Sequence, residues 1–159
     1  MDLDAVLVGT LALWVAEQHP DIAGLVSINT IIRHPLESVM LLVGRFGIPR
    51  WVKAVANDSL EKGIDEKAYV RLPMRSTYEL ALLSRNVRAN LGKITCPALL
   101  FSSTVDHVVP PANQREIYES ISSTNKTLVE LDDCYHLATM DRGRERVFGG
   151  ILEFGAAVS

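Results

Sequence analysis

The chain has few cysteines, no excess of positive charge and no long apolar run. Cys96 and Cys134 lie far apart, without the spacing of metal ligands, so we expect no metal site. With 16 basic and 19 acidic residues, the net charge of −3 excludes a broad basic surface for nucleic acid. The apolar runs fall short of the roughly 20 residues of a transmembrane segment, and Asp2 and Asp4 argue against a signal peptide. These absences predict a soluble, cytoplasmic protein.

What the chain does contain is enough apolar material for one α/β domain. Hydrophobic residues make up 48% of its 159 residues. Short apolar runs with the character of buried strands alternate with helix-forming segments, and this order is typical of a parallel sheet with right-handed crossovers. The sequence therefore predicts about four parallel strands with helices on both faces. The four runs are the one from Ala5 to Val8 and residues 23–28, 97–103 and 126–131.

The stretch from residue 31 to residue 75 interrupts this alternation. It contains three prolines and no strand signal, and we expect short helices at 36–43 and 51–56. The sequence thus predicts a core formed by residues 1–30 and 76–159, with a helical cap inserted at 31–75; an ordinary pair of surface helices is the alternative. After the cap, Ser76 to Glu79 reads as a capping box that starts the next helix.

Titratable groups follow two of the predicted strands. Asp106 comes shortly after the run at 97–103, and His136 comes shortly after the run at 126–131. Because ligands and chemistry collect beyond the carboxyl ends of parallel strands, we expect these two side chains to meet at one rim of the sheet. The alternatives are a loop aspartate that binds its own backbone and a half-buried structural histidine.

The segments at 10–20, 25–29, 94–111 and 134–136 carry a family resemblance. They read T-L-A-L-W-V-A-E-Q-H-P, L-V-S-I-N, I-T-C-P-A-L-L-F-S-S-T-V-D-H-V-V-P-P and C-Y-H. Together they resemble the C-terminal part of the α/β-hydrolase superfamily, in its carboxylesterase and monoacylglycerol-lipase-like branch. The resemblance implies a truncated α/β-hydrolase fold with a small helical cap. It also implies hydrolysis of a small acyl ester or monoacylglycerol-like substrate by a serine, with His136 as base and Asp106 orienting it. We expect no cofactor.

The nucleophile of that family is not found in the sequence. Members place a serine in G-x-S-x-G on a sharp strand-to-helix turn. Here it is expected between Gly9 and Thr10, where about five residues are missing, and the motif occurs nowhere else in the chain. Since the early loop that helps to form the oxyanion hole is also absent, we expect this chain to be inactive. The alternative function is a non-catalytic hydrolase-fold remnant, or a module for binding or self-association.

Two further expectations concern surfaces. The apolar cap residues Met40, Leu41, Phe46 and Trp51 could line an acyl pocket, or could form a small core of the cap itself. The run from Ala5 to Val8 would be an unprotected edge strand without its family partner, and such edges pair with other chains. We therefore expect a two-fold homodimer through this strand. Aggregation, or a rearranged N-terminus in which residues 1–19 form one helix, are the alternatives.

Overall fold

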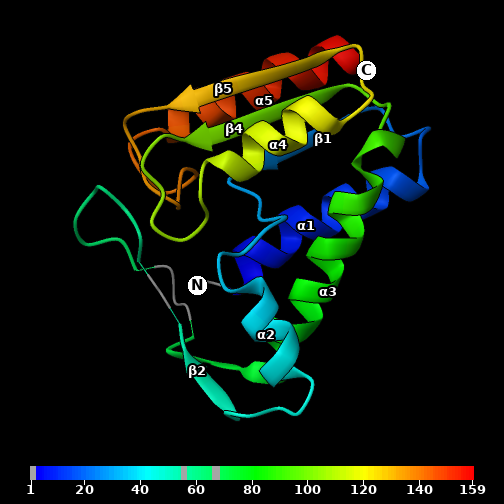
Figure 1. The fold of residues 1–159 in the computed structure, drawn as a ribbon. Coiled ribbons are helices and arrows are strands. Elements are labelled where there is room, and N and C mark those ends of the chain that lie inside the picture. Colours follow the sequence, from blue (N-terminus) through cyan, green and yellow to red (C-terminus); the bar gives the residue numbers. More distant parts are fainter. Residues whose placement is uncertain (1–2, 55–56, 66–68) are drawn as a thin grey trace.

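A three-stranded parallel sheet, flanked by helices, forms the upper part of the protein in the view of Figure 1. The computed structural model describes residues 3–54, 57–65 and 69–159. The strand order is β1-β4-β5, with β1 at Leu25–Ile28, β4 at Ala98–Ser103 and β5 at Lys126–Leu131. All six residues of β4 are buried, as expected for a central strand of apolar residues covered on both faces. The strands at 23–28, 97–103 and 126–131 are thus confirmed to within two residues.

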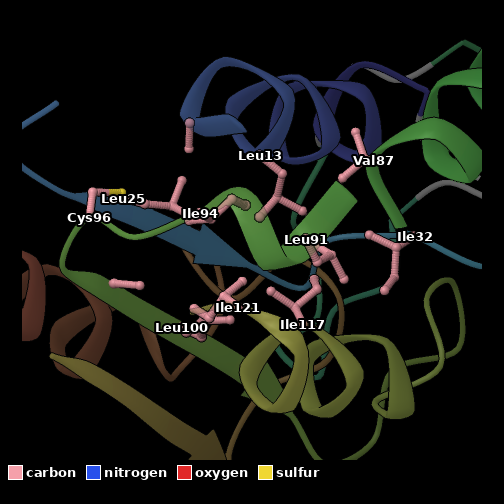
Figure 2. Close-up of a cluster of buried hydrophobic side chains, with 12 residues drawn as sticks. Leu13, Leu25, Ile32, Val87, Leu91, Ile94, Cys96, Leu100, Ile117 and Ile121 are labelled. Carbon is pink, nitrogen blue, oxygen red and sulfur yellow. The ribbon is translucent and has the colours of Figure 1, made fainter. Parts of the chain in front are cut away.

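Helices cover both faces of this sheet, as predicted. On one face, α1 (Leu3–Gln18), α3 (Met74–Asn90) and α4 (Ala112–Ser120) pack together with the short 3-10 helix η1 (Leu91–Lys93). Figure 2 shows the resulting cluster, in which Leu13, Leu91 and Ile117 from three helices lie in one core with Leu100 of β4. On the other face, α5 (Arg144–Val158) packs through Val147 against the strands. None of the helices in the described part of the chain is long and apolar enough to cross a membrane.

The first predicted strand is wrong, because the run from Ala5 to Val8 belongs to α1. A short apolar run suits a buried helix as well as a strand. Here it leads directly into the helix formers between Thr10 and Gln18, and the helix ends two residues before Pro20. The edge strand through which we expected a homodimer is therefore a helix. The structure instead has the alternative arrangement, with one helix through most of the first 19 residues.

The segment between β1 and α3 contains one of the two predicted helices and two unpredicted strands. The helix α2 (Glu37–Gly44) agrees with the prediction at 36–43. At the second predicted helix, β2 (Trp51–Lys53) instead pairs with β3 (Arg71–Pro73) in an antiparallel ladder; residues 55–56 of that prediction lie outside the described residues. Alternate exposure along β2 is the strand signature, but three residues are too few to show it in sequence.

The helix α3 begins at Met74, earlier than the capping box at Ser76 predicted. The amide of Met74 donates to the carbonyl oxygen of Arg50 at 3.1 Å, so the β2–β3 ladder runs directly into the helix. This long-range bond satisfies a donor at the helix start, and a side-chain cap at Ser76 is not needed.

Candidate active site

Asp106 and His136 lie side by side beyond the carboxyl ends of β4 and β5. The distance from His136 Nδ1 to Asp106 Oδ2 is 2.9 Å, and the two side chains are 4% and 1% exposed, respectively. The second carboxylate oxygen, Oδ1, accepts the amides of Val108 and Val109 at 2.8 and 2.7 Å. One oxygen of Asp106 therefore binds the backbone of its own loop, and the other contacts the ring of His136.

This geometry fixes which nitrogen of His136 carries the proton. An ionised carboxylate only accepts hydrogen bonds, so Nδ1 donates to Asp106 and Nε2 is left as the basic nitrogen. Burial of the pair keeps water from competing for the hydrogen bond. The arrangement can therefore take up a proton at Nε2 while the ring is held in one orientation.

Asn29, at the end of β1, forms hydrogen bonds with the end of β4 and with the loop after β5 that carries His136. It has a left-handed backbone at the end of β1, with a φ of 45°, a conformation that asparagine tolerates better than most residues. Its side-chain NH2 donates to Ser103 Oγ and to the carbonyl oxygen of His136, each at 2.9 Å, and its Oδ1 accepts the Ser103 amide at 2.8 Å. The sequence analysis missed this residue, for which the one available signal was an asparagine directly after an apolar strand.

Asp141 is a second residue that the sequence analysis missed. Its carboxylate accepts four backbone amides at 2.7 to 3.0 Å, from Leu60, Glu61, Tyr135 and Arg142. Burial acts to raise the pKa of Asp141, but these four donors outweigh it and hold the pKa below its ordinary value. The ionised carboxylate thus connects the inserted segment at 31–75 with the loop after β5 that carries His136.

A cavity of about 480 Å³ opens beside His136. Its walls come from the loop that carries His136, from Val26 and Ile28 of β1, and from the middle of α1. Gly9 of α1 lines it and packs so closely on Thr30 that a Cβ would collide with the threonine hydroxyl. The place predicted for the nucleophile, between Gly9 and Thr10, is therefore at a cavity that His136 also lines.

No strand-to-helix turn exists at this place. Gly9 and Thr10 are consecutive residues inside α1, and Thr10 Oγ1 donates to the carbonyl oxygen of Ile31 at 2.7 Å. The thiol of Cys134 is no substitute nucleophile, because burial raises its pKa and keeps it protonated. The described residues also contain no cluster of side chains able to hold a metal ion.

The four predicted pocket residues do not form one pocket. Met40 lines a largely apolar cavity of about 280 Å³ between α2, the β2–β3 ladder and α3. Trp51 lines a separate hollow along the ladder, and Leu41 and Phe46 line neither of the two. Phe46 is 70% exposed. The larger part of this cavity's lining, including Leu36, Val39 and Leu72, was not predicted.

Comparison with known proteins gives the family. A family model described as serine aminopeptidase, S33 (Hydrolase_4) matches residues 9–143. The chain is 40% identical to the thermostable monoacylglycerol lipase of Bacillus sp. (strain H-257), over 93% of this chain and 59% of that protein. It is 26% identical to a carboxylesterase of Bacillus subtilis (strain 168), over 55% of this chain and 36% of that protein.

Solved structures agree with this family. A structure from work on LipS and LipT, two metagenome-derived lipolytic enzymes, matches with a TM-score of 0.85 and 33% identity, over 92% of this chain and 60% of that one. The monoacylglycerol lipase of Paleococcus ferrophilus has the same fold, with a TM-score of 0.81 at 21% identity, over 95% and 65% of the two chains. The chain thus spans about three fifths of the length of these relatives. It belongs to the serine aminopeptidase S33 family of α/β-hydrolases, in the lipase- and esterase-type branch that includes monoacylglycerol lipases.

Proposed function

We propose that this chain carries the acid and base of a serine carboxylic ester hydrolase, with His136 as general base and Asp106 as the residue that orients it. The observation that carries this proposal is the buried contact of 2.9 Å between the two side chains beyond the carboxyl ends of adjacent parallel strands. This arrangement is that of two members of a Ser-His-Asp triad.

The chemistry follows from the free Nε2 of His136. A serine hydroxyl at the neighbouring cavity would attack the ester carbonyl while Nε2 takes its proton. The protonated imidazole then gives that proton to the departing alcohol, which leaves an acyl-enzyme. A water molecule, deprotonated in turn at Nε2, releases the carboxylic acid and restores the serine. Asp106 stabilises the imidazolium throughout and keeps its own charge.

The substrate class that fits best is a small acyl ester or monoacylglycerol. The relatives named as a monoacylglycerol lipase and a carboxylesterase support this class. We assign residues 31–75 as a cap over a core of residues 1–30 and 76–159. The apolar cavity beside Met40 is the place in the cap where an acyl chain would gain most from burial, at about 25 cal/mol per Å² of apolar surface removed from water.

We further propose that these 159 residues alone do not turn over esters, because they contain no G-x-S-x-G serine. The purified chain should hydrolyse p-nitrophenyl esters at the background rate and should not be labelled by a fluorophosphonate probe. Stoichiometric labelling of any serine would overturn the inactive assignment and identify a substitute nucleophile.

The acid and base roles need a test in which a nucleophile is present. A chimaera would place the front segment of an active family member, including its serine, ahead of residue 9 of this chain. We expect this chimaera to hydrolyse monoacylglycerols, and expect His136→Ala to lower kcat by about 10⁴-fold or more. Asp106→Asn should cost a similar factor because it favours the wrong tautomer. The exposed His19 provides the matched control, and His19→Gln should leave kcat unchanged. An active His136→Ala chimaera would refute the base assignment.

One observation favours a second candidate function, a module for binding or self-association. Helix α1 exposes several large apolar side chains, since Val8, Leu11 and Trp14 are 66%, 44% and 39% exposed. Apolar side chains grouped in this way mark association surfaces. Light scattering over a concentration series would distinguish the candidates, since a chain that remains a monomer at every concentration excludes self-association.

A further inference from the structure

Asp58, in the segment between β2 and β3, contacts both loops of the acid–base pair. Its side chain is 11% exposed. Oδ2 accepts the backbone amides of His107 and His136, at 3.1 and 3.2 Å, and Oδ1 lies 2.7 Å from Nδ1 of the His107 ring. The carbonyl oxygen of Asp58 also accepts the amide of Leu137 at 3.2 Å. One residue of the inserted segment therefore holds the backbone of His136 and the residue that follows Asp106.

The sheet itself does not hold these two loops together. The β4–β5 ladder ends at the pair Ser103↔Leu131, before either loop reaches its functional side chain. Asn29 fixes the carbonyl side of His136, and on the β4 side its side chain contacts Ser103, the last residue of the strand. Asp58 contacts both loops from a segment outside the sheet. Misplacement of a catalytic group by about 1 Å can cost 100-fold in rate, so such a connection matters for the chemistry.

The segment that presents Asp58 is itself anchored. The Asp141 carboxylate accepts the backbone amides of Leu60 and Glu61. His107 also packs edge-on against the ring of Tyr135, with 4.7 Å between ring centroids. These contacts keep the Asp58 carboxylate aimed at the two loops.

We propose that Asp58 is a positioning residue that sets the spacing of Asp106 and His136, so that seating of residues 57–61 controls whether the pair is formed. The role rests on the proposed function, because it is the base and acid of that function that Asp58 positions. The inserted segment thereby regulates the site through the backbone of its base, in addition to any contact with substrate.

The test uses the uniformly 15N-labelled 159-residue chain and NMR of its histidine ring nitrogens and backbone amides. Two readouts are remote from Asp58 itself: solvent exchange of the His136 Nδ1 proton, and exchange of the Val109 amide, which donates to Asp106 Oδ1. In Asp58→Ala we expect both to accelerate about tenfold or more, because hydrogen bonds to a charged group are lost. The milder Asp58→Asn should accelerate them less.

Glu61→Gln is the matched control, since it weakens only the exposed ion pair of Glu61 with Arg144 and keeps the backbone amide of residue 61 that donates to Asp141. It should leave both exchange rates unchanged. The β4 amides show whether the fold is intact, and should exchange at the same rate in every variant. If both readouts keep their wild-type rates in Asp58→Ala, or if Glu61→Gln changes them as much, the positioning role is refuted.

A fourth variant separates this inference from the proposed function. Asp106→Asn should shift the His136 ring-nitrogen resonances by changing the tautomer. If it does not, the acid–base pair itself is refuted. If it does while Asp58→Ala has no effect on His136, the proposed function stands and the positioning role alone fails.

Discussion

The sheet has two sides along the order of its strands, the β4–β5 side and the β1 side beside α1. They differ in how many neighbouring strands and helices the described chain provides. β4 and β5 pair over six residues each, between helices α4 and α5 that the same part of the sequence provides. β1 pairs over four residues with β4 alone, and beside it α1 leaves Val8 and Leu11 exposed. The predictions are correct to within a residue on the first side and wrong at α1 on the second. The apolar runs of β4 and β5 pair with a neighbouring strand over six residues, whereas the run at 5–8 belongs to a helix.

Two apolar runs of similar composition have different secondary structures. Ala-Val-Leu-Val at 5–8 is helical, whereas Ala-Leu-Leu-Phe at 98–101 is a buried strand. The difference lies outside the runs. Pro97 precedes the second run and strands lie on both sides of it, while the first continues into strong helix formers.

The largest expected contrast is between Phe101 on the β4 side and Trp14 on the α1 side. Phe101 is 1% exposed and packs so closely on Gly150 that a Cβ on the glycine would meet its ring at 2.9 Å. Phe101→Ala should lower the free energy of unfolding by about 3–5 kcal/mol because it leaves a cavity. Trp14→Ala, at a 39% exposed position, should cost about 1 kcal/mol or less. Urea unfolding measures both, and equal losses would contradict the comparison.

Asn29 lies where the two sides join, and its loss should have the next largest effect. Asn29→Ala leaves the Ser103 amide and the His136 carbonyl without their partners, so we expect about 2–3 kcal/mol of destabilisation. The exposed Asn125 provides the control, and Asn125→Ala should change stability by about 0.5 kcal/mol or less. A cost for Asn29→Ala no greater than for the control would show that β1 does not depend on this junction.

Glu17 on α1 makes the second side sensitive to pH. It is 7% exposed, and neither carboxylate oxygen has a hydrogen-bond partner among the described residues. Burial raises its pKa to about 7, although Lys93 opposes this. Because the folded pKa lies above the ordinary value of 4.5, the protein should be most stable below about pH 4.5 with respect to this group and should lose stability as the pH rises through 7.

We expect that loss to reach about 1–2 kcal/mol by pH 8.5, after allowance for solvent screening. Glu17→Gln should remove this part of the pH dependence and be the more stable protein at pH 8.5. Thermal unfolding of both proteins from pH 5 to pH 8.5 gives the measurement. Parallel stability curves for the two would mean that Glu17 titrates normally in the folded protein.

The smallest effect on stability is expected at Leu11, which is 44% exposed on α1. Leu11→Lys should change the free energy of unfolding by about 0.5 kcal/mol or less. It should nevertheless reduce self-association, measured by light scattering, because it places a charge in the exposed apolar face. Leu82→Lys on α3, at a 39% exposed position, is the control and should leave the association unchanged. Equal effects of the two variants would place the associating surface elsewhere.

The sequence located Asp106 and His136 because each follows a short apolar run, and the order of runs places their ends at one rim. Asn29 and Asp58 could not be found in this way. Both residues contact His136, which lies 107 positions from Asn29 and 78 positions from Asp58 in the sequence. Asn29 also has a left-handed backbone. No local periodicity of the sequence indicates such contacts. The ladder of β2 and β3 was missed for a related reason, since each strand has only three residues.

The order of the strands also has a consequence for how the chain folds. The chain between Ala98 and its partner Lys126 contains only the helix α4. The chain between Leu25 and its partner Ala98 contains the whole inserted segment and α3. The second loop is more than twice as long, so closing it costs at least about 0.6 kcal/mol more in chain entropy. The unit β4–α4–β5 is therefore the part of the sheet that a folding nucleus can form cheaply, and β1 docks onto it. Since Asp106 and His136 both follow strands of that unit, we expect the rim that holds them to form before the inserted segment docks on it with Asp58.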